Sequence, residues 1–181
     1  MTWKEFYKNR LNDNYFSHVK NQYRKFIDEV ENTFNTNDIV MEVGCGIGSI
    51  TKALIERKKA KYFLSDVNEE MLKLTEKNVC RKGMNYNILD KLPFHVDVIH
   101  SHGVLEHFEP EEVKKIINNQ RAVCRKLVHY VPSNKYDYKS FGDEMLLSKE
   151  EWKKIICPYE IKEFNNGYLT SHETSLMLWM V

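Results

Sequence analysis

Residues 40–51, VMEVGCGIGSIT, are the part of the sequence that most constrains the fold. An apolar stretch runs through Glu42 and Val43, glycines occupy positions 44, 46 and 48, and an apolar helical pattern begins there. Glycine has no Cβ, so such a turn bends sharply and lets the main chain lie close to a ligand. Between a strand and a helix N-terminus, it is typical of a nucleotide-binding α/β fold.

The residues around this turn separate the possible ligands. Dinucleotide-binding turns have the spacing G-x-G-x-x-G and hold a pyrophosphate at the helix N-terminus. Here the spacing is G-x-G-x-G, Ser49 takes the third-glycine position, and Glu42 precedes Gly44 by two residues. A carboxylate there repels a pyrophosphate and suits a cationic group. S-adenosylmethionine (SAM) carries an ammonium group and no phosphate, and therefore fits better. A tight turn without a ligand is the structural alternative.

Strands and helices alternate along the chain. We expect an N-terminal helix over 16–30 and then strands at 39–43, 61–65, 86–89, 97–101, 127–131, 160–164 and 174–181. Helices are expected between them at 48–58, 69–81, 110–124 and 148–157. This order predicts a Rossmann-like, doubly wound α/β fold with a mostly parallel seven-stranded sheet. The last two strands have no helix between them, so we expect an antiparallel C-terminal strand.

The length fits one domain. We expect residues 1–181 to form a single domain, with 1–37 as an N-terminal helical cover and 38–181 as the Rossmann-like core.

Asp66 ends the second expected strand, eighteen residues after Gly48. A carboxylate at this place can accept hydrogen bonds from both hydroxyls of a ribose. The alternative is an acid in a surface turn. With the glycine turn ahead of it, we favour ribose binding and expect the adjacent Val67 to lie against an adenine ring.

Three segments carry a resemblance to a known family. E-V-G-C-G-I-G-S at 42–49 resembles motif I of class I SAM-dependent methyltransferases, and S-D-V-N-E-E-M-L at 65–72 is similar to the ribose-binding segment. V-D-V-I-H-S-H-G-V-L-E-H-F-E-P-E-E at 96–112 resembles the methyltransferase type 11 small-molecule branch. The resemblance implies SAM as cofactor, S-adenosylhomocysteine as product and a small-molecule methyl acceptor. It also implies the strand order 3-2-1-4-5-7-6.

The resemblance implies roles for particular residues. Asp90, in N-I-L-D-K-L-P-F, is the candidate for the adenine amino group, and the backbone at Ser101 and His102 is the candidate for the methionine ammonium. The implied cofactor-binding residues are Glu42, Gly44, Cys45, Gly46, Gly48, Asp66, Val67, Asp90, Ser101 and His102.

His102, Glu106 and His107 are the candidate catalytic residues. An imidazole near the sulfonium could take a proton from the acceptor as attack begins. The alternative for Glu106 and His107 is to cap and pack the junction with the next helix. Ubiquinone-type O-methyltransferases carry E-x-x-E-H here, a set tied to a divalent cation. Gly103 replaces the first acid in this chain, so we expect no metal site.

Composition argues against several partners. With 27 basic and 26 acidic residues the net charge is +1, which disfavours nucleic acid. The loop after 97–101 also lacks the N/D-P-P-Y/F motif of amino-methylating nucleic-acid enzymes. The four cysteines are widely spaced, and we find no signal peptide or membrane span. We therefore expect a cytoplasmic protein with no membrane partner.

The N-terminal segment and residues 132–147 are expected to select the acceptor. Tyr15 and Tyr23 could steady a sulfonium by cation–π attraction, although Tyr23 also fits core packing. Without an inserted cap domain, the acceptor pocket is open or is closed by a second copy in a homodimer. Three alternatives stay open: a SAM-binding scaffold without turnover, an NAD-dependent dehydrogenase, and a protein or ribosomal-RNA acceptor.

Overall fold

The fold is described by a computed structural model for residues 2–8, 10–136, 143–165 and 174–180, with the backbone alone at 164, 165 and 174–180. Five parallel strands form its centre in the order β3-β2-β1-β4-β5. They are β1 (Ile39–Val43), β2 (Lys61–Asp66), β3 (Met84–Asn85), β4 (Val96–His102) and β5 (Cys124–Pro132). The strand order reverses between β1 and β4, so crevices form at the carboxyl ends of these strands.

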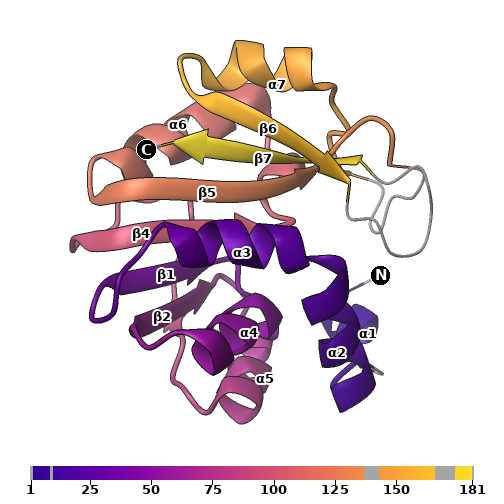
Figure 1. Cartoon of the computed structure of the whole chain (residues 1–181), viewed down its shortest axis with the longest axis vertical. Helices are drawn as coiled ribbons and strands as arrows, with labels where there is room; N and C mark the ends of the chain where they lie inside the picture. Colours follow the sequence, from indigo (N-terminus) through magenta and orange to yellow (C-terminus); the bar gives the residue numbers. More distant parts are fainter. Residues whose placement is uncertain (1, 9, 137–142, 166–173, 181) are drawn as a thin grey trace.

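Two further strands extend the sheet beyond β5. The backbone of β7 (Thr174–Met180) runs antiparallel to β5, with Leu176 opposite Val131. The backbone of β6 (Glu160–Asn165) pairs antiparallel with β7. Figure 1 shows both strands at the edge next to β5.

Helices cover both faces of the sheet. They are α1 (Trp3–Tyr7), α2 (Asp13–Gln22), α3 (Arg24–Asn32), α4 (Ser49–Arg57), α5 (Glu69–Val79), α6 (Pro110–Arg121) and α7 (Lys149–Ile156). Successive side chains of a strand point to opposite faces. Val40 and Val98 therefore pack in the cluster that α2, α3 and α4 build, while Met41 and Ile99 pack in the cluster of α6 and α7.

The N-terminal cover is divided more finely than the sequence pattern predicts. The expected helix over 16–30 is two helices, α2 and α3, which meet at Tyr23 (φ −100°, ψ 20°). The break places the Tyr23 ring 4.0 Å from the His102 ring and 5.3 Å from the Tyr130 ring, between centroids. In Figure 1, α1 and α2 lie on the side of the sheet to which the parallel strands point.

The prediction of a strand at 86–89 is wrong. The third strand is only Met84–Asn85, paired with Ser65 and Asp66. Asn87 turns the chain after it, because the Asn87 side-chain oxygen accepts a hydrogen bond from the backbone of Leu89.

A capping box formed by Ser148 and Glu151 begins α7. Ser148 Oγ accepts a hydrogen bond from Glu151 N at 3.2 Å, and a Glu151 carboxylate oxygen accepts from Ser148 N at 2.8 Å. None of the described helices has the length and apolar character needed to span a bilayer.

Candidate active site

The glycine turn after β1 packs tightly against the loop after β4. Gly44 has φ +64°, and a Cβ there would lie 2.6 Å from Val104 Cγ2. A larger residue would therefore be strained in its backbone and would collide with Val104. This close fit brings the carboxyl ends of β1 and β4 together.

Asp66, at the end of β2, is held against this turn. Its carboxylate accepts hydrogen bonds from Gly46 N at 2.9 Å and from Asn68 N at 2.8 Å. Burial raises the pKa of Asp66, and the backbone N–H groups oppose that shift. A carboxylate has about four acceptor positions, so Asp66 can accept further hydrogen bonds from a ligand.

A cavity of about 260 Å³, here the turn cavity, lies beside Asp66. Gly44, Gly46, Val67 and Ile88 contribute to its wall. Val67 is 66% exposed and offers an apolar surface to a flat ring.

Asp90 is an exposed residue and does not line the turn cavity. The chain turns at Asn87, and this turn brings Asn87 and Ile88, rather than Asp90, to the cavity wall. The structure thus corrects the placement of Asp90 at the cofactor site, which assumed a longer third strand.

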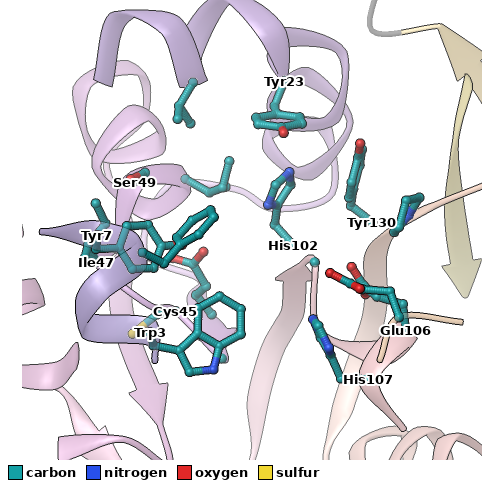
Figure 2. A pocket seen from close by; sticks show the side chains of 18 of the residues that line it. Trp3, Tyr7, Tyr23, Cys45, Ile47, Ser49, His102, Glu106, His107 and Tyr130 are labelled. Carbon is teal, nitrogen blue, oxygen red and sulfur yellow. The ribbon is translucent and has the colours of Figure 1, made fainter. Parts of the chain in front are cut away.

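A second cavity, of about 160 Å³ and here called the aromatic cavity, adjoins the first (Figure 2). Its aromatic lining consists of Trp3, Phe6, Tyr7, Tyr15, Tyr23, Tyr130 and Tyr136, together with His102 and His107. The two cavities share six lining residues: Trp3, Tyr7, Gly44, His102, Gly103 and His107. They are therefore two halves of one hollow at the switch point of the sheet.

Glu42 lines the aromatic cavity from β1 and is only 3% exposed. One of its carboxylate oxygens accepts hydrogen bonds from Thr51 Oγ1 at 2.6 Å and Thr51 N at 3.2 Å. Burial raises the pKa of Glu42 to about 7, and the two bonds from Thr51 oppose that rise. A cationic ligand group in this cavity would stabilise its ionised form.

His102 stands where the two cavities meet. Its ring stacks on Tyr130 at 4.3 Å between centroids and meets the edge of Tyr23 (Figure 2). Burial lowers the pKa of His102 to about 3, so the imidazole is neutral at pH 7. Its Nε2 is buried and has no hydrogen-bond partner among the described residues. The Nε2 atom of His102 can therefore form a hydrogen bond with a bound molecule.

Of three further predicted cofactor residues, only Cys45 lines one of the two cavities. Ser101 lines neither cavity, and its Oγ lies 2.7 Å from His129 Nδ1 in the core, which leaves only its backbone for a ligand. Gly48, with φ +73°, is the N-cap of α4. Cys45 lines the aromatic cavity, and burial raises the pKa of its thiol, which does not suit a nucleophile.

Glu106 and His107 belong to the short helix η1 (Leu105–His107) and both line the aromatic cavity. Burial, together with the smaller effect of the charges of Glu144 and Asp143, raises the pKa of Glu106 to about 8. His107 Nδ1 lies 3.0 Å from Asp143 Oδ1. The capping box of α6 is formed by Glu109 and Glu112.

Sequence reasoning missed two parts of the site. The first is α1, which carries Trp3 and Tyr7. Its signal is the T-x-x-E spacing of Thr2 and Glu5, which form a capping box. The second is the pair Asp143 and Glu144, which no local pattern marks. Of the acceptor-selecting segment 132–147, residues 137–142 lie outside the described residues.

The strand order and the hollow at the carboxyl ends of β1 and β4 define the Rossmann-like α/β fold that class I SAM-dependent methyltransferases share. Residues 40–126, just under half of the chain, match the family model described as a methyltransferase domain. The Rossmann-like α/β prediction and the resemblance stated from motif I are confirmed.

Solved structures share the fold. A SAM-dependent methyltransferase from Aquifex aeolicus matches at 15% identity and a TM-score of 0.71, over 100% of both chains. Magnesium protoporphyrin IX methyltransferase from Synechocystis PCC 6803, solved with bound SAM, matches at 16% identity and a TM-score of 0.66. That match covers 99% of this chain and 96% of the other.

A curated relative matches part of the chain. Ribosomal RNA small subunit methyltransferase A of Clostridium botulinum (strain Loch Maree / Type A3) is 23% identical over 129 residues. The match covers 71% of this chain and 44% of the relative, so the chain spans less than half of that protein's length.

Proposed function

We propose that the protein transfers the sulfonium methyl group of SAM to a nucleophilic O, N, S or C atom of a small-molecule acceptor. The observation that carries this proposal is the shared wall of the two cavities at His102 and Gly103. The turn cavity has the carboxylate and the apolar surface that suit an adenosine. The aromatic cavity, with Glu42 in its wall, is suited to the methionine end of SAM and to the acceptor, so the methyl group is transferred beside His102.

In this proposal each wall of the hollow holds one part of SAM. Asp66 accepts the ribose hydroxyls, while Val67 and Ile88 contact the adenine, with the Asn87 side chain in place of Asp90. Glu42 faces the methionine ammonium, and the backbone of Ser101 and His102 completes that end. The alternating glycines let the chain lie close to the cofactor.

Bound SAM supplies a methyl group that is already activated by the positive sulfur. The residues of the chain orient the acceptor in line with the S–CH₃ bond and exclude water with their aromatic rings. Orientation can lower a barrier by ~7–11 kcal/mol in favourable cases. For a hydroxyl acceptor, neutral His102 takes the released proton at a ring nitrogen, because a methylated oxonium is a stronger acid than an imidazolium with a pKa of about 3. The new bond forms to the methyl carbon, and the S–C electron pair remains on sulfur in S-adenosylhomocysteine.

Ribosomal RNA is a second candidate acceptor, because the matched Clostridium botulinum relative is a ribosomal RNA methyltransferase. The nearly neutral net charge and the absence of an N/D-P-P-Y/F motif favour a small molecule. A SAM-binding scaffold without turnover has the same cofactor site and differs only in the absence of methyl transfer.

We also propose four features that the sequence predicts. The chain forms a single domain over 1–181 with a seven-stranded sheet and an antiparallel last strand. The protein is cytoplasmic, and a homodimer closes the acceptor cavity. Sedimentation equilibrium with and without SAM measures the oligomeric state.

Isothermal titration calorimetry with SAM, S-adenosylhomocysteine and NADH tests the cofactor assignment. We expect both adenosyl ligands to bind and NADH not to bind. Asp66→Asn should weaken SAM binding by roughly tenfold to a hundredfold, because it replaces a charged acceptor of two hydrogen bonds (about 1.5–3 kcal/mol). Asp90→Asn, at an exposed site outside the cavity, should bind SAM like the wild type.

Two results would overturn these assignments. Equal SAM affinity of wild type and Asp66→Asn removes Asp66 from the ribose site, and weaker binding by Asp90→Asn restores the adenine role predicted from sequence. Transfer of a labelled methyl group to ribosomal RNA, with none to a panel of small molecules, would show that the acceptor is RNA and not a small molecule. SAM binding without any methyl transfer would favour the SAM-binding scaffold over the enzyme.

A further inference from the structure

Three potential metal ligands from two distant segments meet where the two cavities adjoin: His107 lines both, Asp143 lines the turn cavity and Glu144 lines the aromatic cavity. One ligand atom each from His107, Asp143 and Glu144 lies within 4.8 Å of the other two. A hydrogen bond from Met145 N to the carbonyl oxygen of Glu106, at 2.7 Å, joins the two segments beside them. This contact fixes the acidic pair against η1.

Glu106 provides an independent indication of a ligand. It is 3% exposed and lines the same cavity as His107 and Glu144, and its Oε2 has no hydrogen-bond partner among the described residues. A buried carboxylate oxygen without a partner is costly. Figure 2 shows Glu106 and His107 on one side of the cavity, across from Trp3 and Tyr7.

The local charge has the sign that attracts a cation. Glu106, Asp143 and Glu144 are three carboxyl groups close enough for electrostatic interaction, and Glu144 is also buried. Grouping acids in this way is unfavourable unless a positive charge lies between them. Among the described residues that line this cavity, none is a lysine or arginine.

We propose that His107, Asp143 and Glu144 bind a divalent cation where the two cavities meet, with Glu106 facing it from the aromatic cavity. One imidazole and several carboxylate oxygens suit Mn²⁺, Fe²⁺ or Zn²⁺. Asp143, with its side chain 65% exposed, lies at the solvent end and gives the ion a path of entry. The sequence argument against a metal considered only the loop at 103–107, where Gly103 replaces an acid.

The metal site also restricts the chemical class of the methyl acceptor, and this inference rests on the proposed function. A cation in the acceptor cavity would bind an oxygen donor, so it favours an acceptor with a hydroxyl or carboxylate group near the methylated atom. Loss of an acceptor hydroxyl proton is easier when its oxygen is bound to a cation.

Titration of the full-length protein with Mn²⁺, followed by the electron paramagnetic resonance signal of free Mn²⁺, tests the site. We expect one ion per chain. His107→Asn and Asp143→Asn should each weaken Mn²⁺ binding by about tenfold or more, as for ligand-shell changes in other metal sites. Glu111→Gln serves as the matched control, because Glu111 is an exposed acid on α6 that pairs with Lys114.

Each outcome is decisive. The absence of a bound ion in the wild type, or equal Mn²⁺ affinity in wild type and Asp143→Asn, would overturn the site. Asp143 is exposed, so its variant should stay folded, and circular dichroism checks this. Calorimetry with SAM on the same samples separates the proposals: SAM binding without Mn²⁺ binding defeats only the metal site, and the reverse defeats only the cofactor assignment.

Discussion

At the residue scale, Glu42 shows how one side chain can serve both the fold and a ligand. It lies on β1, bound to Thr51 of α4, with its carboxyl group removed from water. Ionisation is costly in that environment and would be favoured by an ammonium group nearby. The same residue therefore links protein stability, pH and cofactor binding.

This gives a pH-dependent prediction for the cofactor-free protein. The pKa of Glu42 is about 7 in the fold, against an ordinary value of 4.5, so the folded state binds more protons than the unfolded state between these values. Its contribution to the free energy of unfolding should thus fall as pH rises from about 4.5 to 7, by roughly 3 kcal/mol. Glu42→Gln should lose this part of the pH dependence.

Urea unfolding at pH 5 and pH 8 measures the effect. The difference in unfolding free energy between the two pH values should be smaller in Glu42→Gln than in the wild type. The exposed control Glu150→Gln should match the wild type. An identical pH dependence in Glu42→Gln would show that Glu42 ionises normally in the fold.

His102 leads to a prediction about turnover. Removal of a proton acceptor should slow methyl transfer to a hydroxyl by on the order of 10²–10⁴. His102→Ala should therefore reduce kcat much more than it changes the affinity for SAM. S-adenosylhomocysteine release, with an acceptor identified by a methyl-transfer screen, measures kcat. Calorimetry gives the affinity.

His18→Ala is the control for His102→Ala, because His18 is an exposed histidine that lines neither cavity. Wild-type turnover in His102→Ala would remove His102 from the mechanism. A parallel loss of SAM binding and turnover would instead identify a residue that only holds the cofactor.

At the scale of elements, α1 is held in place almost entirely by tertiary contacts. A helix of five residues is not stable alone. The Trp3 ring lies 6.2 Å from the Tyr7 ring and 5.8 Å from the His107 ring, between centroids. Both α1 residues line both cavities, so the helix is part of the binding site.

We therefore expect Trp3→Ala to loosen α1 and weaken SAM binding by about tenfold, from the loss of roughly 1.4 kcal/mol of aromatic contacts. Hydrogen exchange of residues 2–8 should be faster in this variant, and SAM should slow exchange in the wild type. Trp3→Phe keeps a ring, so its SAM affinity and its exchange rate should lie between those of the wild type and Trp3→Ala. Unchanged exchange in Trp3→Ala would show that α1 docks through other contacts.

Elements with strong local patterns are predictable from the sequence, and those shaped by packing are not. β1, the glycine turn and α4 follow each other in a pattern that only a strand, a turn and a helix satisfy. The break at Tyr23 has no proline or glycine to announce it. It depends on the rings of His102 and Tyr130, more than 75 residues away in sequence.

At the scale of the whole molecule, the sequence predicts the cofactor half of the hollow better than the acceptor half. Glu42, Gly46 and Asp66 occupy adjacent strand ends, so the order of strands alone brings them together. Asp143 contacts His107 although the two residues are 36 positions apart in the sequence, with α6 and β5 between them. Only the completed fold reveals that contact, so it could not be predicted from spacing.

The shared wall of the two cavities has a thermodynamic consequence. A ligand that binds in one cavity and fixes the Trp3 and Tyr7 side chains also changes the shape and the mobility of the other cavity, because both residues line both cavities. Linkage is reciprocal for binding free energies, so the factor by which one ligand changes the affinity of the second must equal the factor in the opposite direction. Occupancy of one half is thus expected to report on occupancy of the other.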